Sequence, residues 1–427
     1  MFKKFIQGRL EKRAAVFFRK NPQLKVVAVA GSIGKTTTKH HIGTLLAEQY
    51  RVRMHEGGFN TELGAPLAVL GLGLPESLHS ILGWWTILRA AAYESRHPAD
   101  FDVLVLELGV DHPGDMAKFA RYIHPNIAVV TAVTPEHMEY FGSLDAVAKE
   151  ELSIADFSNE ILINRDDIDG KYAEDVSNPN LDTYGSTGAA EYRLEISDFS
   201  LTDGYSGKII TPGDSEDVEV KVAVFGEHSL RPVMGAVAVA VKMGVTPENI
   251  AKGLEAIHPT AGRMNPLHGA RESMIIDDSY NSSPAAAAAA LQTLYSIDAP
   301  ARIVLLGEMK ELGESSAAEH EKLGDLCDPN LLAWVVTVGE QAEKYIAPAA
   351  RQRGNQVKSC KTALEAGGFI NGIIEPGAVI LVKGSQGNIY LEEAIKIFLH
   401  DESDDKQLVR QSRQWLATKQ AFFEKNS

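Results

Sequence analysis

Short apolar runs recur along the chain, and each is followed by a polar or glycine-rich turn. The first run, residues 26–30 (VVAVA), leads into GSIGKTTTK, and similar runs occupy residues 102–109, 126–133 and 160–164. Unbroken apolar runs of this length are typical of strands buried on both faces of a parallel sheet. The helix-compatible segments between them, at 37–49 and 145–157, predict a layered α/β domain around a mostly parallel sheet.

The same alternation restarts after residues 258–262 (HPTAG) and predicts a second, smaller, Rossmann-like α/β domain. Its expected strands are 274–277, 302–306, 334–338 and 379–382, and its expected helices are 284–295 and 317–327. Between the domains, residues 180–225 alternate in a way that predicts an antiparallel excursion, followed by helices at 226–243 and 245–257. We therefore expect a central phosphate-loop domain at 25–258 and a C-terminal domain at 259–400.

The two ends of the chain differ from these domains. Residues 1–24 predict an amphipathic helix with a basic face, since Phe2, Phe5, Ile6, Leu10, Phe17 and Phe18 recur near helical spacing among lysines and arginines. Such a helix more commonly packs on the following domain than binds a membrane surface, and both fates stay open. Residues 401–427 predict a charged helical tail with Trp415, Leu416, Phe422 and Phe423 as docking residues. The apolar segment 84–93 is expected in the core.

Composition narrows the function classes. The formal net charge of -15 argues against a general nucleic-acid binder, which needs a broad basic surface. Two cysteines, Cys327 and Cys360, are too few for a disulfide framework, so a reducing cytoplasm is expected. No apolar run reaches the roughly 18 residues that a membrane-spanning helix needs.

The segment GSIGKTTTK has the composition of a phosphate-binding loop between a strand and a helix. Gly31 and Gly34 permit a tight turn, so that amide N–H groups and the helix N-terminus face one concavity suited to phosphate oxygens. Lys35 would neutralise the β and γ phosphates, and the Thr36 hydroxyl would reach a phosphate-bound Mg²⁺. The segment Gly31, Ser32, Gly34, Lys35, Thr36 and Thr37 is therefore expected to bind ATP with Mg²⁺.

Polar residues follow the other predicted strands at the edge where open α/β sheets bind ligands. Glu107 ends one strand and is placed to hold Mg²⁺. His137 follows another, and on spacing alone it is as consistent with a structural role as with a ligand. The loop at 57–66 (GGFNTELGAP) is either a plain connection or a substrate contact, through Asn60 and Thr61.

Together these segments resemble the Mur ligase superfamily, the ATP-dependent ligases that add amino acids or peptides to peptidoglycan precursors. The resemblance runs from about residue 25 to about residue 399 and rests on ordered motifs: GSIGKTTTK, GGFNTELGAPL, LELGVDHPGDM, TPEHMEYFGSLDAVA, GEHS, AGRM, IIDDSYNSSP, LLGEMKELG and LVKGSQG. IIDDSYNSSP and GEMKELG point to the branch that adds D-alanyl-D-alanine.

The resemblance implies a reaction through an acyl phosphate, and it implies residue roles. His137 would bind a second Mg²⁺, and Arg263 would reach the γ phosphate. Asp278, Tyr280 and Asn281 would lie along the nucleotide, while Lys383 and Ser385 would face the carboxylate of an incoming dipeptide. The substrates would be a nucleotide-sugar peptide precursor and an amino acid or dipeptide, and the enzyme is expected to act as a monomer.

Three departures from the family pattern affect these roles. The family's carbamylated lysine lies fourteen residues after the histidine, where this chain has Glu151; we expect Glu151 to supply a permanent carboxylate to the metal. The alternatives are that Glu151 is a surface residue and Lys149 is carbamylated, or that neither acts. Ser229 and Pro232 replace two family asparagines, one of which contacts adenine, which leaves the nucleotide preference open. The phosphate loop starts at residue 31, so we expect this sequence to lack a counterpart of the family's amino-terminal UDP-binding domain.

The expected catalytic residues are Lys35, His137, Glu151 and Arg263. The expected metal ligands are Thr36, Glu107, His137 and Glu151. The leading hypothesis is a peptide-bond-forming ligase that adds D-alanyl-D-alanine to a cell-wall precursor. The alternatives are a related ligase with another acceptor, such as a polyglutamate or another peptide polymer, and a non-catalytic nucleotide-binding subunit.

Overall fold

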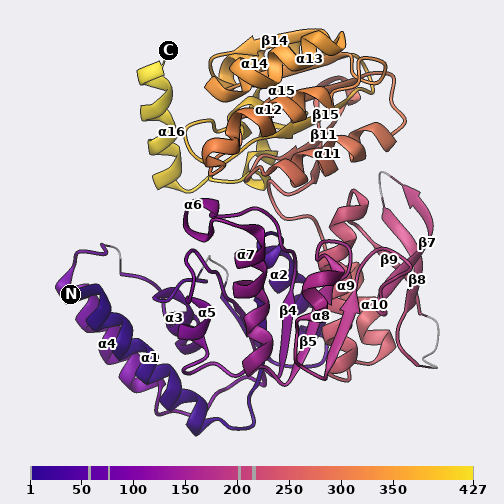
Figure 1. Cartoon of the computed structure of the whole chain (residues 1–427). Helices are drawn as coiled ribbons and strands as arrows, with labels where there is room; N and C mark the ends of the chain where they lie inside the picture. The colour runs from indigo at the N-terminus through magenta and orange to yellow at the C-terminus, as the bar shows by residue number, and fades with distance from the viewer. Residues whose placement is uncertain (1, 56–58, 76, 201–202, 214–217, 427) are drawn as a thin grey trace. The chain divides into compact units, whose positions relative to one another are not determined.

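The computed structural model describes residues 2–55, 59–75, 77–200, 203–213 and 218–426 (Figure 1). The chain divides into two compact units, one of residues 1–222 and 230–257 and the other of residues 223–229 and 258–427. Each unit is built around a sheet with helices packed against it, which confirms the expected α/β class. In the part of the chain that is described, no helix is both long and apolar enough to cross a bilayer.

The first unit is built on a parallel sheet with strand order β2-β3-β1-β4-β5-β6. The strands are β1 (Lys25–Ala30), β2 (Val52–Met54), β3 (Val103–Glu107), β4 (Ile127–Val130), β5 (Glu160–Asn164) and β6 (Leu181–Tyr184). β1 lies between β3 and β4, so the loop after β1 opens at the middle of the carboxyl edge. In open α/β sheets this edge is where ligands bind.

Helices cover both faces of this sheet. The first face is packed by α1 (Phe2–Lys20), α3 (Gly64–Leu70), α4 (Ile81–Glu94), α5 (Met116–Phe119) and α7 (Leu144–Leu152), which share one core with alternate residues of the strands. The other face is packed by α2 (Lys35–Ala47) and α9 (Leu230–Lys242), and α10 (Pro247–Glu255) packs on these two helices. The remaining helical segments are α6 (Met138–Phe141), η1 (Ser153–Phe157), α8 (Gly170–Glu174) and, in the second unit, η2 (Glu227–Ser229). Two helical layers around a parallel sheet explain why its inner strands, β1, β3, β4 and β5, are largely apolar.

Some local predictions for this region hold and others are wrong. The antiparallel excursion is confirmed as the sheet β7 (Arg193–Ser200), β8 (Gly204–Ile210) and β9 (Val218–Val222). β6, predicted as part of it, instead extends the parallel sheet beside β5. The expected helix at 226–243 begins only at Leu230, and the helix at 145–157 changes to a 3₁₀ turn at Ser153.

The prediction that residues 84–93 are core is wrong for half of the helix. In α4 only Trp84 and Ala91 are buried, whereas Trp85 is 55% exposed and Tyr93 is 61% exposed. Apolarity predicted burial, but this helix is apolar around most of its circumference and only one face meets the core. The lead helix α1 does pack on the domain, through Ile6, Leu10, Ala14 and Phe17.

The second unit has a mixed sheet with strand order β10-β11-β15-β12-β13-β14, in which only β10 is antiparallel. Its strands are β10 (Asn265–His268), β11 (Met274–Asp278), β12 (Arg302–Gly307), β13 (Trp334–Val338), β14 (Val357–Cys360) and β15 (Val379–Lys383). Its helical segments are η3 (Ala270–Glu272), α11 (Pro284–Ser296), η4 (Gly313–Ser315), α12 (Ser316–Asp325), η5 (Ala342–Ile346), α13 (Ala347–Arg353), α14 (Ala363–Ile373), α15 (Glu392–Phe398), η6 (Glu402–Gln407) and α16 (Arg413–Asn426). The sequence did not predict the edge strands β10 and β14, because they are short and carry polar residues.

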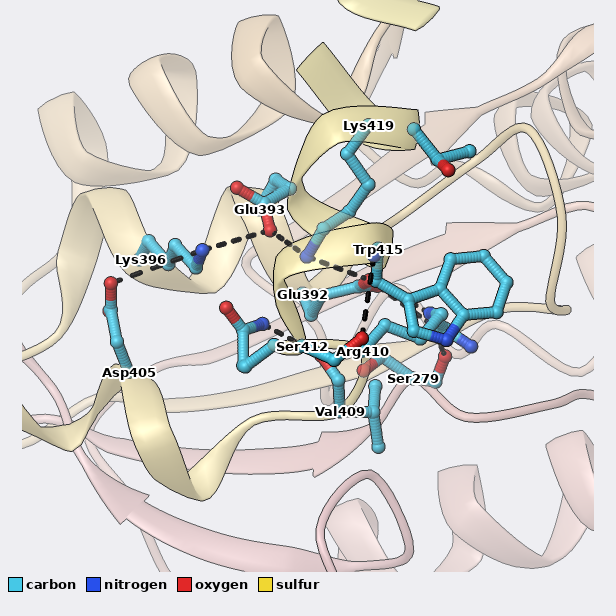
Figure 2. A network of polar contacts seen from close by, with 12 residues as sticks. Ser279, Glu392, Glu393, Lys396, Asp405, Val409, Arg410, Ser412, Trp415 and Lys419 are labelled. Atoms are coloured by element: carbon cyan, nitrogen blue, oxygen red, sulfur yellow. Dashed lines mark hydrogen bonds and ion pairs between the residues drawn. The ribbon is translucent and has the colours of Figure 1, made fainter. Parts of the chain in front are cut away.

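The tail docks on the second unit through a buried charge network (Figure 2). Glu392 of α15 is fully buried and receives two hydrogen bonds from Arg410, at 2.8 and 2.7 Å. Lys419 of α16 lies 3.5 Å from the same carboxylate and also pairs with Glu393. Phe422 and Phe423 pack on Tyr390, as expected of docking residues, with ring centroids 5.2 and 6.3 Å from it. Trp415 and Leu416 are not docked: they are 41% and 42% exposed.

We expect the substitution Glu392→Gln to destabilise the second unit by about 3 kcal/mol or more, because it leaves the buried Arg410 guanidinium without its carboxylate partner. Calorimetric unfolding and limited proteolysis of the tail would measure the effect. Glu424→Gln is the matched control, since Glu424 is an exposed carboxylate on α16. Equal unfolding temperatures for parent and Glu392→Gln would contradict this account.

His41 makes the stability of the first unit sensitive to acid. It is buried in α2, and its Nδ1 atom has no hydrogen-bond partner in the described chain. Burial lowers its pKa to about 3, so the unfolded chain binds a proton below pH 6.5 that the folded chain does not. Stability is therefore lost as pH falls below 6.5, by about 2 kcal/mol at pH 5 from this group alone.

The variant His41→Leu should remove this contribution and flatten the decline of stability between pH 6.5 and 5. Urea unfolding at several pH values would measure it, with His79→Leu, at an exposed histidine, as the control. If His41→Leu changes the free energy of unfolding by the same amount at every pH, the decline with acid does not come from His41.

Candidate active site

The loop after β1 wraps closely around backbone from β4. Gly31 has φ of 118°, and a Cβ there would lie 2.4 Å from Thr131 Oγ1 and 2.8 Å from the Ala132 amide nitrogen, so only glycine fits. Ser32 fastens the loop, since its amide donates to Ala132 O at 2.9 Å and its hydroxyl accepts from the Thr134 amide at 3.0 Å. Gly34, with φ of 81°, precedes α2 and turns the chain into the helix. The loop thus presents the N-terminus of α2 as a phosphate site.

Lys35 occupies the concavity of this loop. Its ammonium donates to the carbonyl oxygen of Ser32 at 3.0 Å and to that of Gly31, and it lies 4.0 Å from a carboxylate oxygen of Glu136. These carbonyl oxygens cannot neutralise its charge. A triphosphate in the loop would therefore compete with the Glu136 carboxylate for this cation.

Glu107 and Thr36 face each other across the carboxyl edge. The Thr36 hydroxyl donates to Glu107 at 3.0 Å, and the Asn60 amide donates to the same carboxylate at 3.0 Å. Glu107 is 5% exposed, and Lys39 of α2 lies 3.4 Å from it. Burial lowers the pKa of Lys39, an effect that the charge of Glu107 opposes. The structure brings Thr36 and Glu107 together, the two residues that the sequence predicted to share a Mg²⁺ ion, and adds Asn60 and Lys39 as neighbours of the same carboxylate.

Glu151 reaches the phosphate loop from α7. It is 2% exposed, so the interpretation of Glu151 as a surface residue is wrong, and its carboxylate accepts a hydrogen bond from the Gly31 amide at 2.7 Å. Burial raises the pKa of this carboxyl to about 7, an effect that nearby Lys35 partly opposes. A cation beside it would favour the ionised form. Lys149, two residues earlier on the same helix, is exposed.

His137 lies just before α6 in a strained backbone conformation. Its φ is 49°, in the left-handed region that non-glycine residues seldom adopt. Its Nε2 atom lies 3.4 Å from an Asp111 oxygen and 3.6 Å from a Glu136 oxygen. The imidazole therefore has two carboxylates beside it, and Glu136 also lies near Lys35.

The residues at this edge suit Mg²⁺ as a partner of bound phosphates rather than as an ion held by protein alone. Among the described residues, no three His, Cys, Asp or Glu side chains form a ready metal site. Mg²⁺ normally binds through one or two carboxylates, water and substrate phosphates, and it prefers oxygen. The buried Glu107 carboxylate beside the Thr36 hydroxyl provides that donor set.

Two further loop residues predicted at the site have other surroundings. Thr61 uses its hydroxyl to accept from the Gly64 amide at 3.2 Å at the start of α3. Thr37 lies in the first turn of α2 behind Thr36. Gly57 and Gly58 of the same glycine-rich motif fall outside the described residues. Substrate contacts by Asn60 and Thr61 stay predictions.

A second cluster lies in the second unit, where β11 and β15 end side by side. Asp278 and Lys383 are register partners on these strands, and their side chains form an ion pair of 2.7 Å with Lys383 2% exposed. Lys383 also donates to the Asn281 carbonyl at 2.8 Å. Residues predicted for the nucleotide and for the dipeptide thus meet at one place, and Lys383 has partners inside the unit.

Tyr280 projects from this cluster between two arginines. The Arg263 guanidinium lies 4.4 Å from its ring centroid and Arg410 lies 6.0 Å from it. Arg410 also donates to the carbonyl oxygens of Ser279 and Tyr280, at 2.9 and 3.2 Å. Tyr280 is 38% exposed, so its ring offers a flat surface next to cationic groups. Such a surface suits a nucleotide base or phosphate.

Ser385 fastens the neighbouring loops. Its hydroxyl donates to the Ser282 carbonyl at 3.1 Å and accepts from the Lys310 amide at 3.0 Å. His320, the histidine after GEMKELG, accepts from the Met309 amide at 2.8 Å. These contacts hold the motif loops on the sheet edge.

The two positions where the family has asparagine lie in different units. Ser229 belongs to the second unit and donates to the Phe225 carbonyl at 2.7 Å, whereas Pro232 lies in α9 of the first unit. Neither provides the amide group expected for adenine. The nucleotide preference therefore stays open.

The sequence did not single out Lys39, Asp111, Glu136 or Arg410. Asp111 and Glu136 lie inside two of the motifs given above, so the sequence could have predicted that they lie near His137. Arg410 lies in the tail, beyond every motif, and no sequence signal connects it to Tyr280.

Two family models match the chain. A model described as the Mur ligase middle domain matches residues 29–240, and one described as the Mur ligase glutamate ligase domain matches residues 262–386. Together they cover the first cluster and all of the second except Arg410.

Individual relatives agree with these matches. The chain is 28% identical over 379 residues to the UDP-N-acetylmuramoyl-tripeptide–D-alanyl-D-alanine ligase of Bacillus subtilis, covering 87% of this chain and 75% of that protein. Among solved structures, MurF from Acinetobacter baumannii superposes with a TM-score of 0.73 at 27% identity, covering 90% of this chain and 78% of that one. MurF from Thermotoga maritima in complex with ADP has the same fold, with a TM-score of 0.74 at 22% identity and coverage of 94% and 84%.

Proposed function

We propose a substrate pair for this chain, which belongs to the Mur ligase family. In an ATP-dependent reaction it joins D-alanyl-D-alanine to the peptide of a UDP-muramoyl precursor. The names of its relatives support this choice of substrates. The observation that carries the proposal is the phosphate loop with Lys35 in its concavity and Thr36 on Glu107. We also propose that the enzyme works in the cytoplasm as a monomer.

The first step would transfer the γ-phosphoryl group of ATP to a substrate carboxylate. A carboxylate oxygen attacks phosphorus, the bond to the β-phosphate oxygen breaks, and ADP leaves. Lys35 and the amides at the start of α2 would hold the phosphates in line, which is the main demand of phosphoryl transfer. Mg²⁺, when bound by Thr36 and Glu107, would neutralise charge on the β and γ phosphates.

The second step would form the peptide bond. The amine nitrogen of the incoming dipeptide attacks the acyl carbon and gives a proton to water, and the bond from this carbon to the phosphate oxygen breaks, so that inorganic phosphate leaves. His137 and Glu151 are proposed near the acyl phosphate, with Glu151 in the place of a lysine carbamate. In the second unit, Arg263 is proposed for the γ phosphate and Asp278, Tyr280 and Asn281 for the nucleotide. Lys383 and Ser385 are proposed for the dipeptide's carboxylate.

Phosphate release from ATP and Mg²⁺ tests this function. The purified chain is given UDP-muramoyl-tripeptide, with and without D-alanyl-D-alanine, and the precursor is weighed by mass spectrometry. Release that needs both substrates, with a mass gain of one dipeptide, is the expected result. If phosphate is released only with a different amine or acceptor, the proposed substrates are wrong. Tight ATP binding without phosphate release would favour a regulatory subunit.

A further inference from the structure

The helices α1 and α4 of the first unit leave a cationic and apolar surface uncovered. They pack against each other and lie side by side along one edge of the unit (Figure 1). On α4 the exposed face carries Ile81, Leu82 and Trp85, which are 73%, 78% and 55% exposed. We call the exposed residues of α1 and of α4 together the α1/α4 face.

The apolar part of this face is a stripe, not a scatter of single residues. Ile81, Leu82 and Trp85 lie on neighbouring positions of α4 and are exposed, and exposed Leu78 lies in the turn just before the helix. The opposite side of α4, which carries Trp84 and Ala91, already fills the core. Contiguous exposed apolar surface of this kind marks an interaction site, because water penalises it.

The other part of the face is basic. α1 contains seven lysines and arginines and a single acid, Glu11, in a chain whose net charge is -15. Its inward side is occupied by Ile6, Leu10, Ala14 and Phe17, and Lys3, Lys4, Arg9 and Lys12 are exposed. Positive charge is thus concentrated on one helix of an acidic protein.

Aromatic and basic side chains are paired on both helices. Arg9 lies over the Phe5 ring at 5.1 Å, and Arg89 lies over the Trp85 ring at 4.7 Å. Phe5 is 53% exposed. Exposed aromatic rings beside long basic side chains are the composition of helices that lie in a membrane interface, with rings at headgroup level and cations at the phosphates.

We propose that the α1/α4 face binds the surface of an anionic phospholipid bilayer. The basic residues of α1 meet lipid phosphates while Leu82 and Trp85 enter the headgroup region. Charge complementarity favours an anionic bilayer, because its phosphates pair with the cations of α1, whereas a neutral apolar partner would offer them no counter-charge. The proposal is independent of the substrates assigned above.

Sedimentation with vesicles tests this proposal on the full chain. Vesicles of phosphatidylcholine with phosphatidylglycerol should bind the protein about tenfold more tightly than phosphatidylcholine alone, and high salt should weaken the binding. Light bromination of the acyl chains should quench tryptophan fluorescence, and the variant Trp85→Phe should lose most of that quenching.

Matched variants distinguish the face from general stickiness. Leu82→Ser/Trp85→Ser and Lys4→Glu/Lys12→Glu should each lose vesicle binding. Leu416→Ser/Trp415→Ser and Lys406→Glu/Lys425→Glu change the same residue types at exposed positions of the second unit and should keep it. Equal binding to both vesicle types, or unchanged binding by the face variants, would overturn the proposal. Self-association that the face variants abolish, without vesicle binding, would assign the face to a second copy instead.

Discussion

The variant Lys35→Met is expected to lower ATP-dependent phosphate release by about 10³-fold or more, because charge neutralisation supplies much of the catalysis in phosphoryl transfer. Methionine keeps most of the side-chain length and removes only the ammonium that lies on the carbonyl oxygens of the loop. Turnover would be followed by coupled ADP production. Thermal unfolding of the same sample would show that the loop and the first unit stay folded.

Lys149→Met is the matched control for Lys35→Met. Lys149 is exposed and is also the alternative position for a carbamylated lysine. Unchanged turnover in this variant is expected if Glu151 provides the carboxylate. A large loss would transfer that role to Lys149 and contradict our assignment.

The variant Glu151→Gln is expected to lower turnover by about 10²-fold and to raise the Mg²⁺ concentration needed for half-maximal rate, since a carboxylate is a stronger ligand than an amide. The same variant should nevertheless increase the stability of the folded chain. Burial raises the pKa of Glu151 to about 7, so at pH 8 the folded chain holds an unfavourable buried charge that glutamine lacks. The variant without metal should therefore unfold at a higher temperature than the parent at pH 8, and the difference should shrink toward pH 5.

Two comparisons make the test of Glu151 decisive. Glu150→Gln changes the adjacent carboxylate, which accepts from the Gly114 and Met116 amides, so it should affect stability without changing Mg²⁺ dependence. Glu151→Lys restores the family's residue type and should recover part of the turnover only with added bicarbonate. If Glu151→Gln keeps the parent's rate and Mg²⁺ dependence, Glu151 is a structural residue.

Sequence patterns predicted the parts of the fold that depend on local burial. Val26–Ala30 and Val103–Glu107 are buried on both faces, and that environment demands the unbroken apolar runs that were read as strands. The sequence predicted a tight turn at Gly31 and Gly34, and both have the positive φ of such a turn. It predicted Glu107 at the carboxyl end of a central strand, and the structure places Thr36 against it.

The features that were missed depend on contacts between distant segments. Trp85 and Trp84 are identical in type, yet one is exposed and one buried, and nothing in their local sequence separates them. β6 joins the parallel sheet because β5 offers it an edge, although two of its four residues are polar. Arg410 reaches Tyr280 across 130 residues of sequence, a separation that no motif spans.

The Arg410 guanidinium connects the tail to two parts of the second unit. It donates hydrogen bonds to the Glu392 carboxylate and to the carbonyl oxygens of Ser279 and Tyr280. A ligand that binds only to this arrangement of the Tyr280 loop would then also favour the docked tail. Thermodynamic linkage makes the effect reciprocal, so a docked tail strengthens binding at the loop by the same factor. The C-terminal residues thereby become a reporter: a fluorophore on the end of the chain would register occupancy of the loop.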